Sequence, residues 1–398
     1  MSQSNSTTDS VVIVSAARTA MGSFQGILSD ITGPELGAVA VKAATERVGL
    51  SSTAVDEVLM GCVLSAGTKQ APARQAAIYA GLDECTPCTT VNKMCGSGMK
   101  AVMLGHDALL AGSGDVIVAG GMESMTNAPY LLPKARGGMR LGHGEVKDHM
   151  FLDGLEDAYE GRLMGAYADE VAHTYQLSRD MQDAYAIESL TRAQRACGDG
   201  SFAAEIVPVV VKTRKGDVDV VMDEPPGKAD VAKIPTLKPV FARDGSVTAA
   251  NSSSISDGAA ALVLMRLSEA EKRGLHPLAA IRGHTSFANV PGLFPTAPIS
   301  AISKLFERTG WSKSDVDAFE VNEAFAVVAM LAIRELGLSH DTVNFYGGAC
   351  ALGHPIGASG ARILVTLLNV LKRNGGKRGV ASLCIGGGEA TAMAVELM

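Results

Sequence analysis

The chain has 398 residues, of which 47% are hydrophobic and 19% charged, a composition that excludes a disordered protein and favours about two to three folded domains. Its net charge of −7 lacks the basic footprint of a nucleic-acid-binding protein, so no nucleic-acid partner is expected. The seven cysteines are an odd number spread along the chain, which does not fit a secreted disulfide framework and indicates a reducing compartment.

Neither a membrane segment nor a targeting segment is predicted. No apolar run approaches the roughly 18 residues that a membrane-spanning helix needs, so we expect no membrane partner. The first ten residues, MSQSNSTTDS, lack the apolar core of a signal peptide and the arginines of a transit peptide. We therefore expect a cytoplasmic protein.

Internal similarity predicts a duplicated α/β unit. Four segments of the first 125 residues resemble four segments near the end of the chain, in the same order, which chance does not readily produce. The matched segments begin at Val11 and Leu278, Val55 and Val316, Gly96 and Gly357, and Asp115 and Gly379. The second and third pairs are both offset by 261 residues.

The predicted elements of the two halves are of the same type. Apolar residues at helical spacing predict a helix from Ser97 to Gly112, and its counterpart, residues 361–371, is apolar nearly all round and therefore predicted to be buried. Residues 116–119 and 380–383 are short apolar runs bounded by glycines, as in buried central strands. Helices that alternate with such strands indicate layered α/β halves.

Between the halves, residues 125–255 change in character. Segments rich in proline and glycine predict loops, and a helix is predicted from a Ser178 cap to about Cys197. Lysines and arginines near residues 212–216 and 225–228 add positive charge. This insert is the natural place for ligand-binding loops.

Two residues at equivalent helix entrances form the first candidate site. Cys95 precedes the helix at Ser97, where the helix dipole is expected to lower the thiol pKa, although a small buried hydrophobic role is the alternative. His354 precedes the matching helix; a lone histidine is more often a core or surface residue. In a duplicated protein the two entrances can face one cleft, and a histidine is the usual activator of a nucleophilic thiol.

Cys384 and Asn322 each follow or end a predicted strand. Cys384 leads into three glycines, Gly386–Gly388, whose N–H groups could form an oxyanion hole; an inert strand cysteine is the alternative. Asn322 is either a turn residue or an amide that positions a water. The pair Cys85 and Cys88 has no second half-site, and His106 is interpreted as a core or interface histidine, so no metal is expected.

At these residues the sequence resembles the thiolase family, and within it the acetyl-CoA acetyltransferases. The resemblance runs nearly end to end and rests on motifs in a fixed order. They are VVIVSAART from Val11, NKMCGSGMKA around Cys95, GGMESMTNAPY at 120–130, GSVTAANSSSISDGAAA at 245–261, NEAF at 322–325, GHPIGASG at 353–360 and CIGGG at 384–388.

The resemblance implies a reaction and a role for each candidate. The reaction is the reversible Claisen condensation of two acetyl-CoA to acetoacetyl-CoA plus CoA, in a ping-pong cycle. Cys95 matches the acylated nucleophile, His354 its activator, and Cys384 the acid or base that moves the α-proton. Asn322 matches the residue that holds an oxyanion-hole water, and the N–H groups of Cys95 and Gly386 match a second oxyanion hole.

The resemblance also implies the architecture and the ligands. It predicts two layered α/β core halves, residues 1–124 (completed by about 256–276) and 277–398, with a loop domain, 125–255, that binds coenzyme A. Coenzyme A is substrate and product, no cofactor is bound permanently, and a homotetramer (a dimer of dimers) is expected, with a dimer as the alternative. Positions that match contacts to coenzyme A are Leu155, Met164, Phe241, Ala249, Ser253, Ala324 and Phe325.

Three positions depart from common family patterns. Leu163 stands where many bacterial members have a histidine, and residues 226–228 replace the usual RHG segment near the adenine. Leu293-Phe294-Pro295 resembles the F-P pair of mitochondrial-type members, which accept a 2-methyl branch. We therefore hypothesise that Phe294 marks an enzyme that also cleaves 2-methylacetoacetyl-CoA.

Four other functions were weighed. A degradative thiolase for longer 3-ketoacyl-CoA chains would share the same residues. A ketoacyl-carrier-protein synthase uses a Cys-His-His set, which Cys384 argues against. A Cys-His-Asn hydrolase would release the acyl group to water, and an inactive acyl-CoA-binding scaffold would have no need for Cys95, His354 and Cys384 together.

Overall fold

The computed structural model describes residues 9–398, so the polar N-terminal segment, residues 1–10, lies almost entirely outside the described residues.

The first core half contains β1 (Val11–Thr19), β2 (Gly22–Ser23), α1 (Gly33–Glu46), β3 (Glu57–Gly61), α2 (Pro72–Tyr79), β4 (Cys88–Val91), α3 (Ser97–Leu110), β5 (Val116–Ser124), β11 (Ser256–Arg266) and α7 (Leu267–Lys272). The second contains β12 (Ala279–Ala288), η4 (Pro291–Thr296), α8 (Ala297–Thr309), η5 (Lys313–Asp315), β13 (Ala318–Val321), α9 (Ala326–Leu336), η6 (His340–Thr342), α10 (Ala349–Leu352), α11 (Ile356–Asn374), β14 (Arg378–Ile385) and β15 (Glu389–Leu397).

The strand order repeats in the two halves, as the internal similarity predicts. The main path of the sheet is β13-β14-β15-β12-β1-β11-β5-β3-β4. In each half an antiparallel trio is followed by parallel pairing, β5 with β3 in the first half and β14 with β13 in the second. The halves join where β1 pairs with β12, through Val12↔Ala280 and Ile13↔Ala279. The predicted duplicated α/β fold is confirmed.

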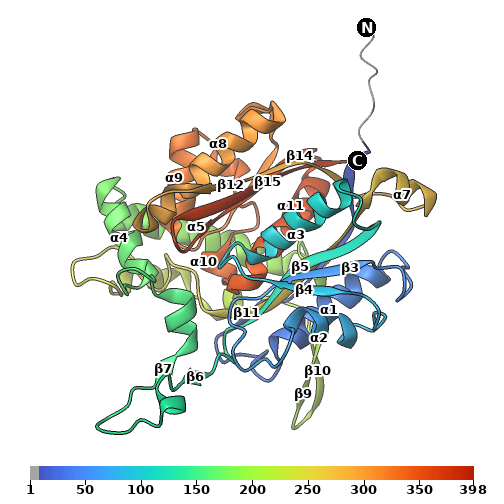
Figure 1. The fold of residues 1–398 in the computed structure, drawn as a ribbon. Helices are drawn as coiled ribbons and strands as arrows, with labels where there is room; N and C mark the ends of the chain where they lie inside the picture. The colour runs from blue at the N-terminus through green and yellow to red at the C-terminus, as the bar shows by residue number, and fades with distance from the viewer. Residues whose placement is uncertain (1–8) are drawn as a thin grey trace.

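Helices α3 and α11 lie side by side between the two halves of the sheet, whereas α1 and α2 cover one outer side and α8 and α9 the other (Figure 1). Residues 356–371 of α11 are buried without interruption, which confirms the prediction from its apolar sequence. A helix is completely buried only when neighbours cover all its faces, which this central layer provides. The starts of α3 and α11 therefore meet inside the molecule.

Glycines make this close meeting possible. A Cβ atom on Gly98 of α3 would lie 2.8 Å from the backbone nitrogen of Ala361, and one on Gly360 would lie 2.4 Å from that of Met99. A Cβ on Gly121 would lie 2.1 Å from the carbonyl oxygen of Gly357. We expected the strand from residue 116 to end at the glycines near residue 120, but β5 continues to Ser124, because these glycines serve close backbone approach instead of a turn.

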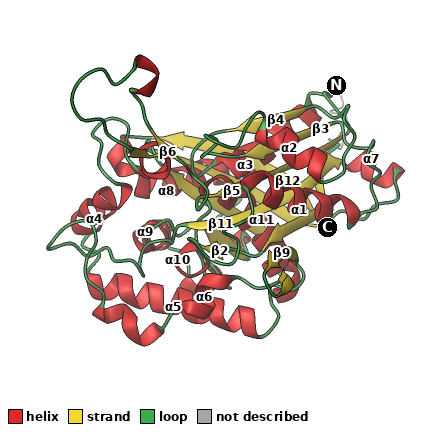
Figure 2. Cartoon of the chain, turned by 90° about the horizontal axis from the view of Figure 1, so that it is seen from below, coloured by secondary structure: helices red, strands yellow, loops and turns green. Residues whose placement is uncertain are grey.

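The insert between the halves is mostly loop, with two longer helices. Its elements are β6 (Tyr130–Leu131), η1 (Ala135–Gly137), β7 (Lys147–Asp148), η2 (Phe151–Leu155), α4 (Met164–Thr174), α5 (Arg179–Gly198), β8 (Ile206–Val207), β9 (Val209–Thr213), β10 (Gly216–Val220), α6 (Glu224–Lys228) and η3 (Val231–Thr236). Ser178 caps α5 by accepting a hydrogen bond from the N–H of Met181, as predicted. Figure 2 shows α4, α5 and α6 gathered at one side of the molecule, away from α7.

Not one helix between residues 9 and 398 combines the length and the hydropathy that crossing a lipid bilayer requires.

Candidate active site

Cys95 lies in a tight turn that leads into α3. The preceding residue, Met94, has a φ of +48°, a backbone conformation that costs free energy in a residue other than glycine and is common at functional sites. Ser97 holds this turn, because its Oγ accepts from the N–H of Lys93 at 2.8 Å and donates to the carbonyl of Met94 at 2.6 Å. The sequence thus fixes the direction of the Cys95 side chain before the helix begins.

The surroundings of Cys95 keep its thiol protonated, contrary to the expectation of a lowered pKa. Burial raises the pKa of the Cys95 thiol to about 11, although the backbone N–H groups of Gly386 and of Cys95 itself donate to the sulfur and lower it. The charge of Glu123 raises it further. Desolvation of the thiolate is the larger effect at this helix entrance, so the thiol pKa rises despite the favourable N–H groups.

Cys384 lies at the end of β14, close to the turn that carries Cys95. It is 1% exposed at the end of β14, and burial, together with the negative charge that Cys95 carries when it is ionised, raises the pKa of Cys384 well above the usual range. A Cβ atom on Gly96 would lie 2.4 Å from the side chain of Ile385, so the entrance of α3 touches the end of β14. The fold therefore brings Cys95, Cys384 and Gly386 together, from segments nearly 300 residues apart.

His354 is held by a hydrogen bond that fixes its tautomer. Its Nδ1 is 2.6 Å from Oγ of Ser359, and that hydroxyl donates its single proton to the carbonyl of Pro355 at 2.9 Å. Nδ1 must then carry the proton, which leaves Nε2 as a buried lone pair with no partner. Burial lowers the pKa of His354 to about 3, with a further contribution from the charge of Arg362.

Asn322 follows β13, as predicted, and its amide is unsatisfied. The residue is 1% exposed, yet neither its side-chain oxygen nor its nitrogen has a hydrogen-bond partner. Its backbone N–H donates to the carbonyl of Ser382 at 3.0 Å, which places it beside the end of β14. Because a buried amide without partners is costly, a free amide here indicates a position for a water or a ligand oxygen.

Five of the predicted coenzyme A and acyl contacts lie in one apolar cluster. Phe325 makes edge-to-face contacts with Phe241 and Phe294, at ring-centroid distances of 6.3 and 6.1 Å. Ala324 belongs to the same cluster, and Met164 packs against it at the start of α4. The sulfur of Met164 also lies 3.5 Å from where a Cβ of Gly386 would stand, which joins this cluster to the candidate oxyanion hole.

A second, smaller cluster surrounds Cys95. Leu155, at the end of η2, and Cys95 both pack against buried apolar residues that include Ile356. Ile356 is two residues after His354. Leu155 is therefore placed beside both helix entrances, where a contact to the substrate is expected.

The loop that carries Ala249 and Ser253 connects these parts. The N–H of Ser253 donates to the carbonyl of Ala324 at 2.9 Å, and the carbonyl of Ser254 accepts from the N–H of His354 at 3.0 Å. Ala249 and Ser254 also line a pocket of about 500 Å³, which Lys228 and Lys233 border. The loop thus contacts both Ala324 and His354, and its Ala249 lines this outer pocket.

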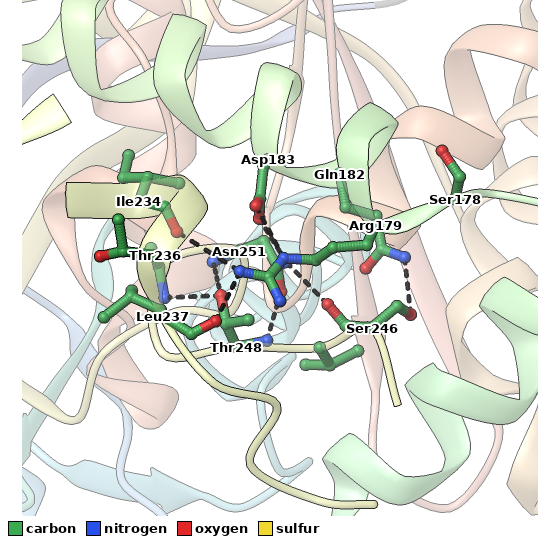
Figure 3. Close-up of polar contacts among 12 residues, drawn as sticks. Ser178, Arg179, Gln182, Asp183, Ile234, Thr236, Leu237, Ser246, Thr248 and Asn251 are labelled. Carbon is green, nitrogen blue, oxygen red and sulfur yellow. Dashed lines mark hydrogen bonds and ion pairs between the residues drawn. The ribbon is translucent and has the colours of Figure 1, made fainter. Parts of the chain in front are cut away.

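A polar network anchors that loop to α5 (Figure 3). Nδ2 of Asn251 donates to Asp183 at 3.0 Å and to the carbonyl of Ser246 at 3.0 Å, while its oxygen accepts from the N–H of Thr248 at 2.7 Å. Nε of Arg179 donates to the same aspartate at 2.7 Å, and its Nη2 donates to the carbonyl of Leu237 at 2.7 Å. The network fixes the loop against α5 and ties it to Leu237, which lines the pocket beside Ala249.

Sequence reasoning gave no role to Glu123, although it lies in the GGMESM motif. Its buried carboxylate accepts from the N–H groups of Val63, Leu64 and Gly357 at 2.9, 3.1 and 2.9 Å. It therefore ties the end of β5 to the first turn of α11, the helix that follows His354. Burial raises the pKa of Glu123 to about 7, and the three N–H groups oppose that rise.

Comparison with known proteins identifies the family. Residues 11–268 match the thiolase N-terminal domain and residues 275–397 the thiolase C-terminal domain. The chain is 51% identical over 391 residues to acetyl-CoA acetyltransferase 1 of Arabidopsis thaliana, with 98% of this chain and 94% of the relative covered. It is 48% identical to an acetyl-CoA acetyltransferase of Chromobacterium violaceum (97% and 99% covered) and 47% identical to one of Saccharomyces pastorianus (97% and 98% covered).

These matches confirm the resemblance found in the motifs. They cover both core halves and the insert between them, and the matched regions contain Cys95, Asn322, His354 and Cys384. The chain belongs to the thiolase family and is an enzyme of the acyltransferase class.

Proposed function

We propose that the protein is an acetyl-CoA C-acetyltransferase, which condenses two acetyl-CoA to acetoacetyl-CoA plus CoA and runs the reverse thiolysis. The observation that carries the proposal is the convergence of two thiols, Cys95 and Cys384, with the N–H of Gly386. Two thiols allow acyl transfer and proton transfer to be divided between separate groups. The names of the relatives support acetyl-CoA as the substrate.

In the first half-reaction, Cys95 becomes acetylated. Its thiol loses a proton to Nε2 of His354, and the sulfur attacks the carbonyl carbon of acetyl-CoA. The C–S bond to coenzyme A then breaks, and the leaving thiolate takes the proton of the Cys384 thiol, which leaves a Cys384 thiolate beside the imidazolium of His354. Because burial keeps both resting groups neutral, the thiolate and imidazolium form together and stabilise each other through their opposite charges.

In the second half-reaction, Cys384 removes an α-proton from a second acetyl-CoA. The enolate oxygen would be stabilised by His354 and by a water on the free amide of Asn322. The α-carbon then attacks the acetyl group on Cys95, and the N–H groups of Cys95 and Gly386 would hold the resulting oxyanion. Breaking the C–S bond to Cys95 releases acetoacetyl-CoA, the Cys95 thiolate takes its proton back from the imidazolium of His354, and Cys384 keeps the α-proton, so all three groups return to their resting states.

The loop domain, residues 125–255, is proposed to bind coenzyme A. Pantetheine would extend from the pocket beside Ala249 toward the apolar cluster that contains Met164, Phe241 and Phe325. Lys228 and Lys233 border the outer pocket and would face the phosphates, although each is also paired with an acidic neighbour, Glu224 and Asp230. Coenzyme A is an anion and the chain has a net charge of −7, so a local patch of lysines would be needed to attract the phosphates.

The direct test follows coenzyme A-dependent loss of acetoacetyl-CoA absorbance under reducing conditions. Wild type and Cys85→Ala, which alters an exposed free thiol, should be active, and Cys95→Ala should be inactive. Loss of the substrate without coenzyme A would instead indicate a hydrolase. Faster cleavage of longer 3-ketoacyl-CoA chains would replace the short-chain assignment with a degradative one.

Cleavage of 2-methylacetoacetyl-CoA is proposed as a second activity of the same site. Phe294, the phenylalanine of the F-P pair, is 2% exposed and its ring contacts Phe325, so it lies in the apolar cluster proposed to receive the acyl end of the substrate. Brisk cleavage of acetoacetyl-CoA with no turnover of the 2-methyl substrate would contradict this. The homotetramer and the cytoplasmic location stay predictions, which sedimentation velocity and cell fractionation would test.

A further inference from the structure

Three side chains that lie outside the candidate active site converge where the two core halves meet. His106 and Asp107 lie near the end of α3, and His284 lies on β12. Nε2 of His284 is 2.9 Å from Oδ1 of Asp107 and 3.3 Å from Nδ1 of His106, which is itself 3.0 Å from the same aspartate oxygen. Within residues 9–398 no other set of three histidine, cysteine or acidic side chains brings its ligand atoms within 4.8 Å.

We propose that His106, Asp107 and His284 form a binding site for a divalent cation of the zinc type. Two imidazoles and one carboxylate are a common ligand set for Zn²⁺. With bonds of about 2.1 Å in a tetrahedral site, neighbouring ligand atoms lie about 3.4 Å apart. The three observed separations fall just short of that value, so a small outward movement of the side chains admits the ion.

The backbone aims the buried ligand at this point. The pairing of β12 with β15 shifts register between Ile281 and Gly283, and such a bulge redirects the side chains that follow it. The carbonyl of His284 accepts a hydrogen bond from Arg308, which fixes the strand there. The rings of His106 and His284 meet edge to face with their centroids 5.0 Å apart, so the two imidazoles are already held in place.

The charges around the site suit a cation that keeps one water. Asp107 is about half exposed, so the carboxylate closes the site from the solvent side and leaves room for a fourth ligand. The charge of Arg308 opposes a cation, and the Asp107 carboxylate offsets it. The sequence predicted no metal because the pair Cys85 and Cys88 has no second half-site, and it forms no motif that joins Asp107 to His284, 177 residues further along the chain.

A cation here would cross-link the two halves, because α3 belongs to the first half and β12 to the second. The first measurement is a titration of metal-depleted enzyme with Co²⁺, whose visible absorption reports four-coordinate binding, followed by competition with Zn²⁺. One equivalent should bind, and saturation should raise Tm by a few degrees, because a ligand that binds only the folded state stabilises it. A thiolate-to-cobalt charge-transfer band would reveal binding at cysteines instead and would overturn the proposal.

Variants of the three proposed ligands test whether Co²⁺ binds at this site and not elsewhere on the protein. Asp107→Asn changes an exposed side chain and should fold normally, yet it should weaken Co²⁺ binding at least about tenfold. His284→Gln should abolish the absorption bands, whereas the matched control His143→Ala, an exposed histidine of the loop domain, should bind as wild type does. Equal affinity in wild type and Asp107→Asn, or no binding by wild type at all, would show that the three side chains form only a hydrogen-bonded cluster.

Discussion

The entrances of α3 and α11 occupy equivalent places in the two halves but carry different chemistry. At the first, Cys95 sits after a strained residue, Met94, and meets the N–H of Gly386. At the second, His354 is fixed by Ser359 and keeps a free Nε2. Burial raises the pKa of the thiol and lowers that of the imidazole, so both are neutral at rest. The two equivalent entrances thus hold the two groups that the proposed mechanism pairs, a thiol and an imidazole.

The largest expected effect tests whether the two entrances act as one unit. Cys95→Ala and His354→Ala should each lower kcat for thiolysis by about 10⁴-fold or more, because each removes a member of the same proton-transfer pair. The double variant should lose little beyond either single one, since groups that act together have non-additive effects. Additive losses in this double-mutant cycle would separate the two entrances mechanistically.

Replacement of the free amide should affect catalysis without weakening the fold. Asn322→Ala should lower kcat about 10²–10³-fold, the typical cost of losing one oxyanion donor. Because neither polar atom of Asn322 has a partner, the variant should melt at the wild-type temperature or higher. Steady-state kinetics and thermal melting test this together, and a large drop in Tm would point to a structural amide.

The pH dependence of Cys95 alkylation measures how far burial raises the pKa of this thiol at the entrance of α3. With a pKa of about 11, the Cys95 thiolate fraction rises about tenfold per pH unit from about pH 7 to about pH 10. Iodoacetamide labelling of the Cys95 peptide, followed by mass spectrometry, should rise in the same way. A plateau below about pH 8 would mean that the helix dipole and the N–H groups outweigh desolvation.

A smaller loss of activity is expected when the hydrogen bond that positions His354 is removed. Ser359→Ala removes the acceptor that holds Nδ1–H of His354, and one hydrogen bond of about 0.5–1.5 kcal/mol corresponds to a roughly 2–10-fold loss in kcat. KM for acetoacetyl-CoA should change little, since the buried Ser359 hydroxyl contacts His354 and Pro355 and lies outside the apolar cluster proposed to bind the substrate. Ser359→Thr, which keeps the hydroxyl, should recover most of the rate, and failure to do so would argue for a packing role.

The smallest effect concerns the carboxylate that ties the halves together. Glu123 has a folded pKa of about 7, raised by burial above its ordinary value near 4.5, so its contribution to stability is complete below about pH 4.5 and is lost as the pH rises through about 7. The difference in Tm between wild type and Glu123→Gln should therefore fall by a few degrees across this range. A difference that grows with pH would mean that the three N–H donors outweigh burial.

The sequence predicted the order of elements and the identity of the candidate residues, because motifs and glycines are local signals. It predicted the cap at Ser178 and the buried character of α11 for the same reason. It could not predict the neutral state of Cys95, since desolvation depends on what the insert and β14 place around the thiol. Glu123, Ser359 and the cluster at His284 were missed because their roles arise from contacts between segments distant in the chain, or from a hydrogen bond that no motif announces.

The glycine contact between α3 and α11 has a consequence for protein engineering. With Gly98 and Gly360 facing backbone atoms at less than 3 Å from any added Cβ, even an alanine would force the two helices apart. That displacement would reach both reactive loops at once, because each helix begins within a few residues of one of them. Libraries of variants that seek new acyl specificity should therefore keep Gly98 and Gly360 unchanged and vary residues of the loop domain instead.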